Sequence, residues 1–355
     1  MAGETGPTAE IANQVSTQLL KWFRWSRFPL KDRNFDCLKP EKHARANKKQ
    51  KHTHPTDVVF SYHDPYLNRK ILFNTDLKSY AKSSISGPNV RGALRSLATT
   101  IDCARASAEW KGRYEVEDRD EIRGLLFVYN HDAEFDADFE RYFAPARKKS
   151  KEEEQEEAAA DVGGIPLEAN QLIHIIQPRT IVYMQTILND VAKLHLSGTF
   201  PKTNYYFYYP DQKLHKVHLE RQKRPATVES ICGPYLIVGH DAVVSYDEQT
   251  QTSKQSFGEG FVVYYNRPGA THLEFMYLFD VLSACQLLDG EKQIRLRVAH
   301  NSPDPQVVSN FRRAVKAFVH DWGFDEYIQS KLDAIELEVL DQQKQSFSQT
   351  KLGWE

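Results

Sequence analysis

The sequence is poor in cysteine, with four in 355 residues, and none of them forms a C-x-x-C pair. This spacing argues against a disulfide framework and against a zinc ribbon. We therefore expect reduced, mostly buried thiols, as is typical of a cytoplasmic protein. An apolar run of about 18 residues and a secretory amino-terminal stretch are also missing, so neither a membrane span nor export is expected. The cysteines are Cys37, Cys103, Cys232 and Cys285.

Signatures of several common enzyme classes are missing as well. The sequence holds no G-x-x-x-x-G-K-[ST] loop, so we expect no built-in ATPase. It holds no G-x-S-x-G elbow, which disfavours an α/β-hydrolase. His52-Thr53-His54 ahead of Asp57 faintly suggests a histidine-based metallohydrolase, but the spacing does not fit H-x-H-x-D-H. A zinc hydrolase is therefore not the favoured interpretation.

Charge is distributed unevenly along the chain. Residues 1–105 contain 18 Lys and Arg against 9 Asp and Glu, a net of +9, whereas the whole chain carries −2. The remaining residues must therefore carry −11. A basic region in a near-neutral protein is either a solvated surface or the electrostatic footprint of a phosphate-backbone binder, and charge alone does not decide between them.

The pattern of apolar residues predicts a mixed α/β chain of about two domains. The charged segment 147–164 is the best boundary, with a first domain at 1–146 and a second α/β domain at 165–355. In the first we expect a helix at 9–25, an exposed basic segment at 39–54, strands at 58–62 and 70–74, a helix after Pro88, a strand at 121–132 and a short helix at 136–146. In the second we expect strands at 172–176, 204–209, 234–239, 260–265 and 293–299, and helices at 180–196, 272–288 and 305–322.

The clearest chemical pattern lies around the two strands at 58–62 and 70–74. HDPYLNR between them supplies turn residues, so the pair should form a hairpin that brings Asp57 close to Asp76. Lys78 should share a face with Asp76, because residues two apart on a strand point the same way. Two carboxylates that hold a hard cation, with a lysine that orients water, suit phosphodiester hydrolysis. The carbonyl of Leu77 is a further candidate metal ligand.

These residues carry a family resemblance. Pro55-Thr56-Asp57 and Asp76-Leu77-Lys78, set in the order helix, strand, strand, strand, helix, strand, resemble the PD-(D/E)xK nuclease superfamily over roughly residues 8–146. The resemblance implies a restriction-endonuclease-like core, with a mixed central sheet flanked by helices, and Mg²⁺ or Mn²⁺ as cofactor. It also implies a role for Glu10, which matches the acid that many members carry on the preceding helix. A weak strand near FDCL, residues 35–38, stands in the place of the first strand.

The expected substrate is nucleic acid, with DNA favoured over RNA. Lys82, Arg91 and Arg95 are candidate phosphate contacts. The basic run Lys48, Lys49 and Lys51 could track a strand. Both sets also suit an ordinary solvated surface. The aromatic run 205–209 is interpreted as a strand packed on both faces rather than as a base-stacking platform.

The leading hypothesis is an endonuclease that acts in defence against foreign DNA, although repair or mobile-element processing fits equally well. The second domain would select substrate or form oligomers, with a homodimer or a partner protein of a defence complex as candidate assemblies. The alternative is a catalytically inactive, nuclease-like subunit that binds nucleic acid within a larger complex.

Overall fold

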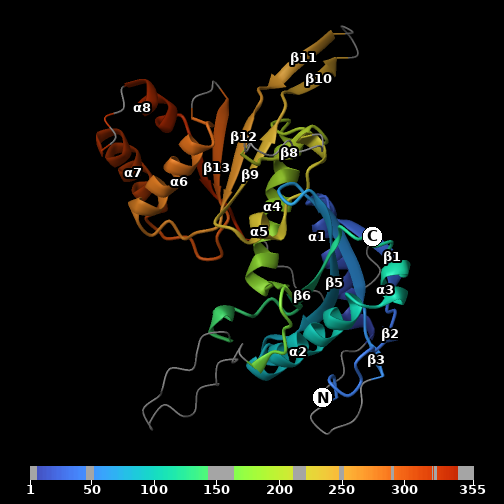
Figure 1. Ribbon diagram of the computed structural model, residues 1–355. Coiled ribbons are helices and arrows are strands. Elements are labelled where there is room, and N and C mark those ends of the chain that lie inside the picture. Colours follow the sequence, from blue (N-terminus) through green and yellow to red (C-terminus); the bar gives the residue numbers. More distant parts are fainter. Residues whose placement is uncertain are drawn as a thin grey trace, which may run out of the picture. The chain divides into compact units, whose positions relative to one another are not determined.

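The computed structural model describes residues 6–44, 52–142, 164–210, 221–247, 252–288, 292–321, 323 and 326–342 (Figure 1). The expected contacts at Lys48, Lys49 and Lys51, and nearly all of segment 147–164, lie outside these ranges. The chain divides into two compact units between Ile181 and Val182. None of the described helices is both long and apolar enough to cross a bilayer.

The first unit is built on a mixed five-stranded sheet. Its strands are β1 (Ser26–Lys31), β4 (Val58–Asp64), β5 (Arg69–Tyr80), β6 (Glu121–Asn130) and β7 (Ile173–Ile176), in the spatial order β1-β4-β5-β6-β7. The pairs β1–β4 and β4–β5 are antiparallel, whereas β5–β6 and β6–β7 are parallel. Helices α1 (Gly6–Trp22) and α2 (Gly87–Ala104) flank the sheet on opposite faces (Figure 1). The expected mixed sheet flanked by helices is confirmed.

The central strands are buried along almost their whole length because helices cover both faces of the sheet. Helix α2 begins after the extended residue Ser86, with Pro88 in its first turn, where a missing N–H costs nothing. It packs Leu94 and Leu97 against Leu126 of β6. Gly124 permits this contact, since a Cβ there would lie 3.0 Å from the Leu97 side chain.

The turn between β4 and β5 fixes the register of the hairpin. The side chain of Asp64 accepts hydrogen bonds from the backbone N–H groups of Tyr66 and Leu67, at 2.8 and 2.9 Å. Asn68 donates its N–H to the Asp64 carbonyl and has a φ of 50°, which asparagine tolerates better than most residues. The resulting register pairs Asp64 with Arg69 at one end and Val58 with Thr75 at the other.

Two expectations for the first unit need correction. The strand beside β4 is Ser26–Lys31 rather than residues near 35–38. It is a largely exposed edge strand, which is why it tolerates Pro29. Its polar sequence lacks the apolar pattern from which a strand is predicted. Phe35–Asp36 (β2) pairs instead with Thr53–His54 (β3). In the expected helix at 136–146, the described residues form only the 3₁₀ turn Phe139–Tyr142 (η2).

The first unit also extends past residue 146, where the first domain was expected to end, because β7 pairs with β6 in its sheet. The smaller elements of this unit are the 3₁₀ turn η1 (Lys82–Ser84) and helix α3 (Ala108–Arg113).

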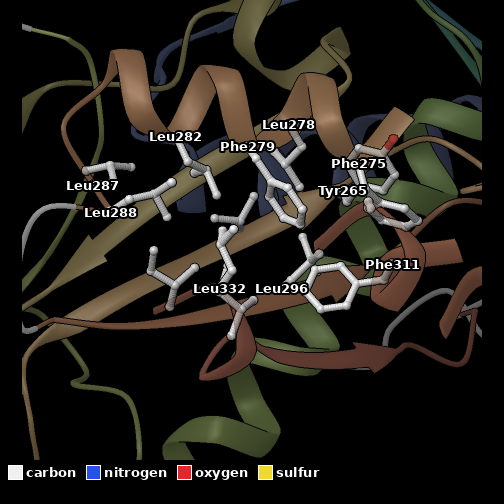
Figure 2. Packing of buried hydrophobic residues seen from close by; sticks show 14 of the residues in the cluster. Tyr265, Phe275, Leu278, Phe279, Leu282, Leu287, Leu288, Leu296, Phe311 and Leu332 are labelled. Atoms are coloured by element: carbon white, nitrogen blue, oxygen red, sulfur yellow. The ribbon is translucent and has the colours of Figure 1, made fainter. Parts of the chain in front are cut away.

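The second unit is centred on another mixed five-stranded sheet, in the order β14-β13-β12-β9-β8. Phe275, Phe279 and Phe311 pack from its helices against strand residues such as Leu296 (Figure 2). The expected strand packed on both faces near 205–209 is confirmed by the burial of Tyr205, Tyr206, Phe207 and Tyr209. The elements are α4 (Pro178–Leu196, which begins in the first unit), β8 (Tyr205–Phe207), η4 (Arg221–Lys223), α5 (Val228–Cys232), β9 (Tyr235–His240), β10 (Val243–Asp247), β11 (Thr252–Phe257), β12 (Gly260–Tyr265), α6 (His272–Ala284), β13 (Gln293–Val298), α7 (Val307–Asp321), α8 (Glu326–Asp333) and β14 (Glu336–Val339).

Candidate active site

Asp57 stands at the start of the β4–β5 hairpin, where the chain enters β4. The register that pairs Val58 with Thr75 places Asp57 opposite Asp76 on β5. The backbone N–H of Leu77 donates to Oδ2 of Asp57 at 2.9 Å. This hydrogen bond ties the carboxylate of one strand to the backbone of the other and fixes its direction.

Asp76 and Lys78 share one face of β5. Parallel pairing aligns Asp76 with Leu126 and Lys78 with Val128, two residues of β6 that pack against α2. Both polar side chains therefore point to the α2 face of the sheet. Lys78 Nζ lies 2.7 Å from Asp76 Oδ1, and the two side chains are 23% and 18% exposed. The pair is shielded but remains open to solvent.

The electrostatics of Asp57 are unusual for a carboxyl group. Burial raises its pKa to about 7, and Asp76 adds to the rise through repulsion and through a hydrogen bond between the two carboxyl groups. The Leu77 N–H and the Lys78 ammonium oppose the rise. Two acids thus converge on one lysine, and Asp57 holds its proton up to about pH 7 because a second negative charge beside Asp76 is unfavourable.

Contacts on both sides of Asp57 hold this segment in place. Thr56 is buried and donates its hydroxyl to Asn74 Oδ1 at 2.9 Å, across the hairpin. The backbone N–H groups of Asp32 and Arg33 donate to the carbonyls of Asp57 and Thr56, at 2.9 and 3.0 Å. Sequence reasoning missed these supports, because nothing in the spacing of Asn74 or Asp32 marks them.

Comparison with known families agrees with this geometry. Residues 1–161 match the model of the GAPS4 protein PD-(D/E)XK nuclease domain. This part of the chain belongs to the PD-(D/E)xK nuclease superfamily. The match covers less than half of the chain, and residues 162–355 lie outside it. No curated protein and no solved structure matches the chain.

Glu10 lies on α1 of the nuclease domain. Within the described part of the chain, its contacts are with residues other than Asp57 and Asp76. Its carboxylate binds Lys31 Nζ at 3.1 Å and accepts a hydrogen bond from Asn13 at 3.1 Å. Lys31 is in register with Val58, the residue after Asp57. The Lys31 side chain therefore shares the α1 face of the sheet with Val58, so Glu10 and Lys31 lie on the face opposite to the one that carries Asp57, Asp76 and Lys78.

The candidate phosphate contacts of the nuclease domain lie after β5 and on α2. Lys82 Nζ forms an ion pair with Asp136 at 3.1 Å, while Arg95 is exposed and donates to the Gly164 carbonyl at 3.1 Å. Arg91 is half-buried on α2. Arg95, Lys42 and Pro55 line a hollow of about 690 Å³. Two cations thus lie along a depression that Pro55, two residues before Asp57 in the sequence, also lines.

Proposed function

We propose that the chain is a Mg²⁺-dependent endonuclease that hydrolyses phosphodiester bonds, with DNA as its substrate. The observation that carries the proposal is the meeting of two carboxyl groups from adjoining strands beside one lysine: Asp57 bonds to the backbone of Leu77, and Asp76 bonds to Lys78. The membership of residues 1–161 in a nuclease superfamily supports it.

The donor set suits a small, hard cation. Carboxylate oxygens are the ligands that Mg²⁺ prefers, and it commonly keeps part of its water shell. Burial and repulsion from Asp76 raise the pKa of Asp57, so ionising both acids beside a single lysine is unfavourable without a further positive charge. A divalent cation would relieve that repulsion. We assign the Leu77 carbonyl as a third protein ligand and Mn²⁺ as a working substitute for Mg²⁺.

Each residue then has a distinct role. Asp57 and Asp76 would hold the cation against the substrate. When bound, it would stabilise charge on the phosphate as a Lewis acid and would lower the pKa of the attacking water. Lys78, anchored on Asp76 at 2.7 Å, orients the water and meets developing negative charge. Glu10 has an indirect role in this proposal, because its carboxylate positions Lys31.

The assignment of a nucleic-acid substrate rests on the nuclease-family match together with charge. The first 105 residues carry a net +9, and a polyanionic backbone is the natural complement of such a region. Arg95 would contact phosphate along the hollow next to Pro55, and Lys82 and Arg91 would add phosphate contacts after β5 and on α2. Lys48, Lys49 and Lys51 belong to the same basic region.

The direct test is cleavage of DNA and RNA substrates by the full chain in the presence of Mg²⁺, of Mn²⁺ and of EDTA. We expect DNA cleavage that EDTA abolishes, and we expect Asp76→Ala and Lys78→Ala to lose it. Asp118→Asn and Lys111→Ala are matched controls, since both residues are exposed in the same unit. Equal cleavage by the wild type and both active-site variants would overturn the assignment.

The alternative is a nucleic-acid-binding subunit without turnover. The second half of the chain, which lies outside the family match, motivates it. This alternative predicts tight, metal-independent binding and no cleavage with any divalent ion.

The biological setting completes the proposal. We assign the nuclease to defence against foreign DNA, and we assign the second domain to substrate selection or to assembly, as a homodimer or with a partner protein. Phage plating on bacteria that express the wild type or Asp76→Ala tests the first point. Equal plating on both strains would argue against defence.

A further inference from the structure

Two cysteines and two histidines converge in the first unit, away from the carboxylates. Cys37 follows β2, His43 lies in a turn, His54 ends β3 and Cys103 lies near the end of α2. One ligand atom of each lies within 4.8 Å of the others. His43, His54 and Cys103 are buried, and Cys37 is half-buried.

The three distances among Cys37, His43 and Cys103 fit the edges of a tetrahedron around zinc, and His54 lies within 4.8 Å of all three. His43 Nδ1 lies 3.4 Å from Cys37 Sγ and 3.5 Å from Cys103 Sγ, and the two sulfur atoms are 3.9 Å apart. Zinc–sulfur bonds of about 2.3 Å and zinc–nitrogen bonds of about 2.0 Å at tetrahedral angles give edges of about 3.5 Å for sulfur to nitrogen and about 3.8 Å for sulfur to sulfur.

His43 and Cys103 have the outer partners that metal ligands usually have. The far nitrogen of His43, Nε2, lies 3.0 Å from Asp102 Oδ2, and Lys39 Nζ holds the same carboxylate at 2.8 and 2.9 Å. A carboxylate behind a histidine fixes the ring and makes its other nitrogen a better ligand. The backbone N–H of Leu38 points to Cys103 Sγ at 3.3 Å, which suits a thiolate.

The tautomer of His54 also suits ligation. Its Nδ1 lies 3.3 Å from the Thr100 hydroxyl, and that hydroxyl donates its own hydrogen to the Ser96 carbonyl at 2.8 Å. Because a hydroxyl has only one hydrogen, Nδ1 of His54 must be the donor in the first contact. The lone pair of the ring is then on Nε2.

From these contacts we infer a structural zinc site made of Cys37, His43, His54 and Cys103. Four protein ligands leave no open position, so the site is structural rather than catalytic. Thiolate and imidazole ligands select zinc over the hard cation proposed for the carboxylates. The C-x₅-H-x₁₀-H spacing and the distant Cys103 match no common zinc motif, which is why the sequence argued against such a site.

The zinc site would tie the long connection between β1 and β4 to helix α2. His54 precedes Asp57 by three residues, so the site anchors the segment that enters the candidate active site. This inference does not depend on the proposed nuclease activity, because it concerns different residues, a different metal and a different measurement.

The test is metal analysis of the full chain, purified under reducing conditions from zinc-supplemented cells. We expect about one zinc per chain, and less than about a tenth of that in the double variant Cys37→Ser/Cys103→Ser. The control Cys232→Ser/Cys285→Ser removes two thiols outside the cluster and should keep its zinc. Asp76→Ala should also keep it, which separates this site from the carboxylates.

A second measurement on the wild type guards against a variant that fails to fold. Exchange of the metal for Co²⁺ should give the intense visible bands of a tetrahedral site and a thiolate charge-transfer band. Removal of zinc by a strong chelator should lower Tm by about 5–10 °C. Protein without bound metal, no cobalt spectrum and an unchanged Tm on zinc addition would overturn the inference. A disulfide between Cys37 and Cys103 in such protein would identify the cluster as a thiol pair.

Discussion

Each unit of the protein contains an aspartate with a raised pKa, half-buried Asp57 in the first and buried Asp190 in the second, and the two differ in their neighbours. In the second unit, burial raises the pKa of Asp190, whereas Arg297, the Tyr264 hydroxyl and Arg295 all lower it. In the first unit, burial raises the pKa of Asp57 and Asp76 raises it further, against the opposing effects of the Leu77 N–H and Lys78. The neighbours of Asp190 thus stabilise its charged form, whereas Asp76 destabilises the charged form of Asp57.

The comparison teaches how to separate a structural ionic cluster from a candidate site. The Tyr264 hydroxyl donates to Asp190 at 3.0 Å, and Arg297 also pairs with Glu336 and Glu338. That cluster satisfies its own charges, whereas Asp57 and Asp76 place like charges side by side. Both aspartates are shielded from solvent. Only the pair of Asp57 and Asp76 lacks enough positive charge for both acids to ionise, and a cation would supply it.

The largest difference should appear in cleavage. We expect Asp76→Asn to lower the single-turnover rate of DNA cleavage by about 10³-fold or more, because a metal ligand is lost. Asp190→Asn should leave the rate per folded molecule unchanged. Circular dichroism checks that both variants are folded. If the two folded variants lost cleavage to a similar extent, Asp57 and Asp76 would not differ from Asp190 in the way proposed.

The next effect concerns stability of the second unit. Arg297→Met should destabilise that unit by about 3 kcal/mol, because Asp190 stays buried without its main counter-charge. The double variant Asp190→Asn/Arg297→Met should recover part of this loss. Urea unfolding followed in two transitions measures it, and an unchanged transition for Arg297→Met would show that the cluster carries little energy.

A smaller effect of opposite sign is expected at Asp57. Its folded pKa of about 7 lies above the unfolded value, so the metal-free folded state binds a proton that the unfolded state has released. Stability contributed by that proton is present at low pH and is lost as pH rises through about 7. Asp57→Asn should therefore stabilise the metal-free chain by about 1–2 kcal/mol at pH 8 and by little at pH 4, after allowance for solvent screening.

Thermal unfolding of both proteins in EDTA across this pH range measures the effect. A gain for Asp57→Asn that grows towards low pH would contradict the assignment of the raised pKa. Added Mg²⁺ should stabilise the wild type at pH 8 more than the variant, since ligand binding to the folded state adds stability.

The smallest effect is expected at Glu10. Its carboxylate binds Lys31 in a half-exposed ion pair, and such pairs contribute less than about 1 kcal/mol. Glu10→Gln should therefore lower cleavage by about tenfold or less, whereas a loss as large as that of Asp76→Asn would make Glu10 a direct member of the site. Rates measured in parallel decide between these.

Sequence alone predicted the part of the site that depends on local geometry. Alternation on a strand placed Asp76 and Lys78 on one face, and turn residues placed Asp57 opposite them, because both relations span few residues. The supports of Asp57 escaped prediction, since Thr56 meets Asn74 only through the exact register. The cluster of Cys37 and Cys103 joins residues 66 positions apart and has no signature in spacing.

The fold shows the same division. The central strands and the helices that cover them carry strong apolar patterns and were predicted. Edge strand β1 carries a weak one, because it is largely exposed and contains Pro29. The place of β7 depends on its pairing with β6, a contact that sequence periodicity does not reveal.

The four-residue turn Pro65–Asn68 lies far along the hairpin from the carboxylates, yet it decides whether they meet. Side chains alternate on a strand, so a shift of one residue in the pairing would turn Asp57 and Asp76 to opposite faces. A chain with one residue inserted or deleted in this turn could therefore still bind nucleic acid but fail to cleave it, although every active-site residue is retained. In comparing natural variants of this chain, loop length between the two strands is as informative as the identity of the acids.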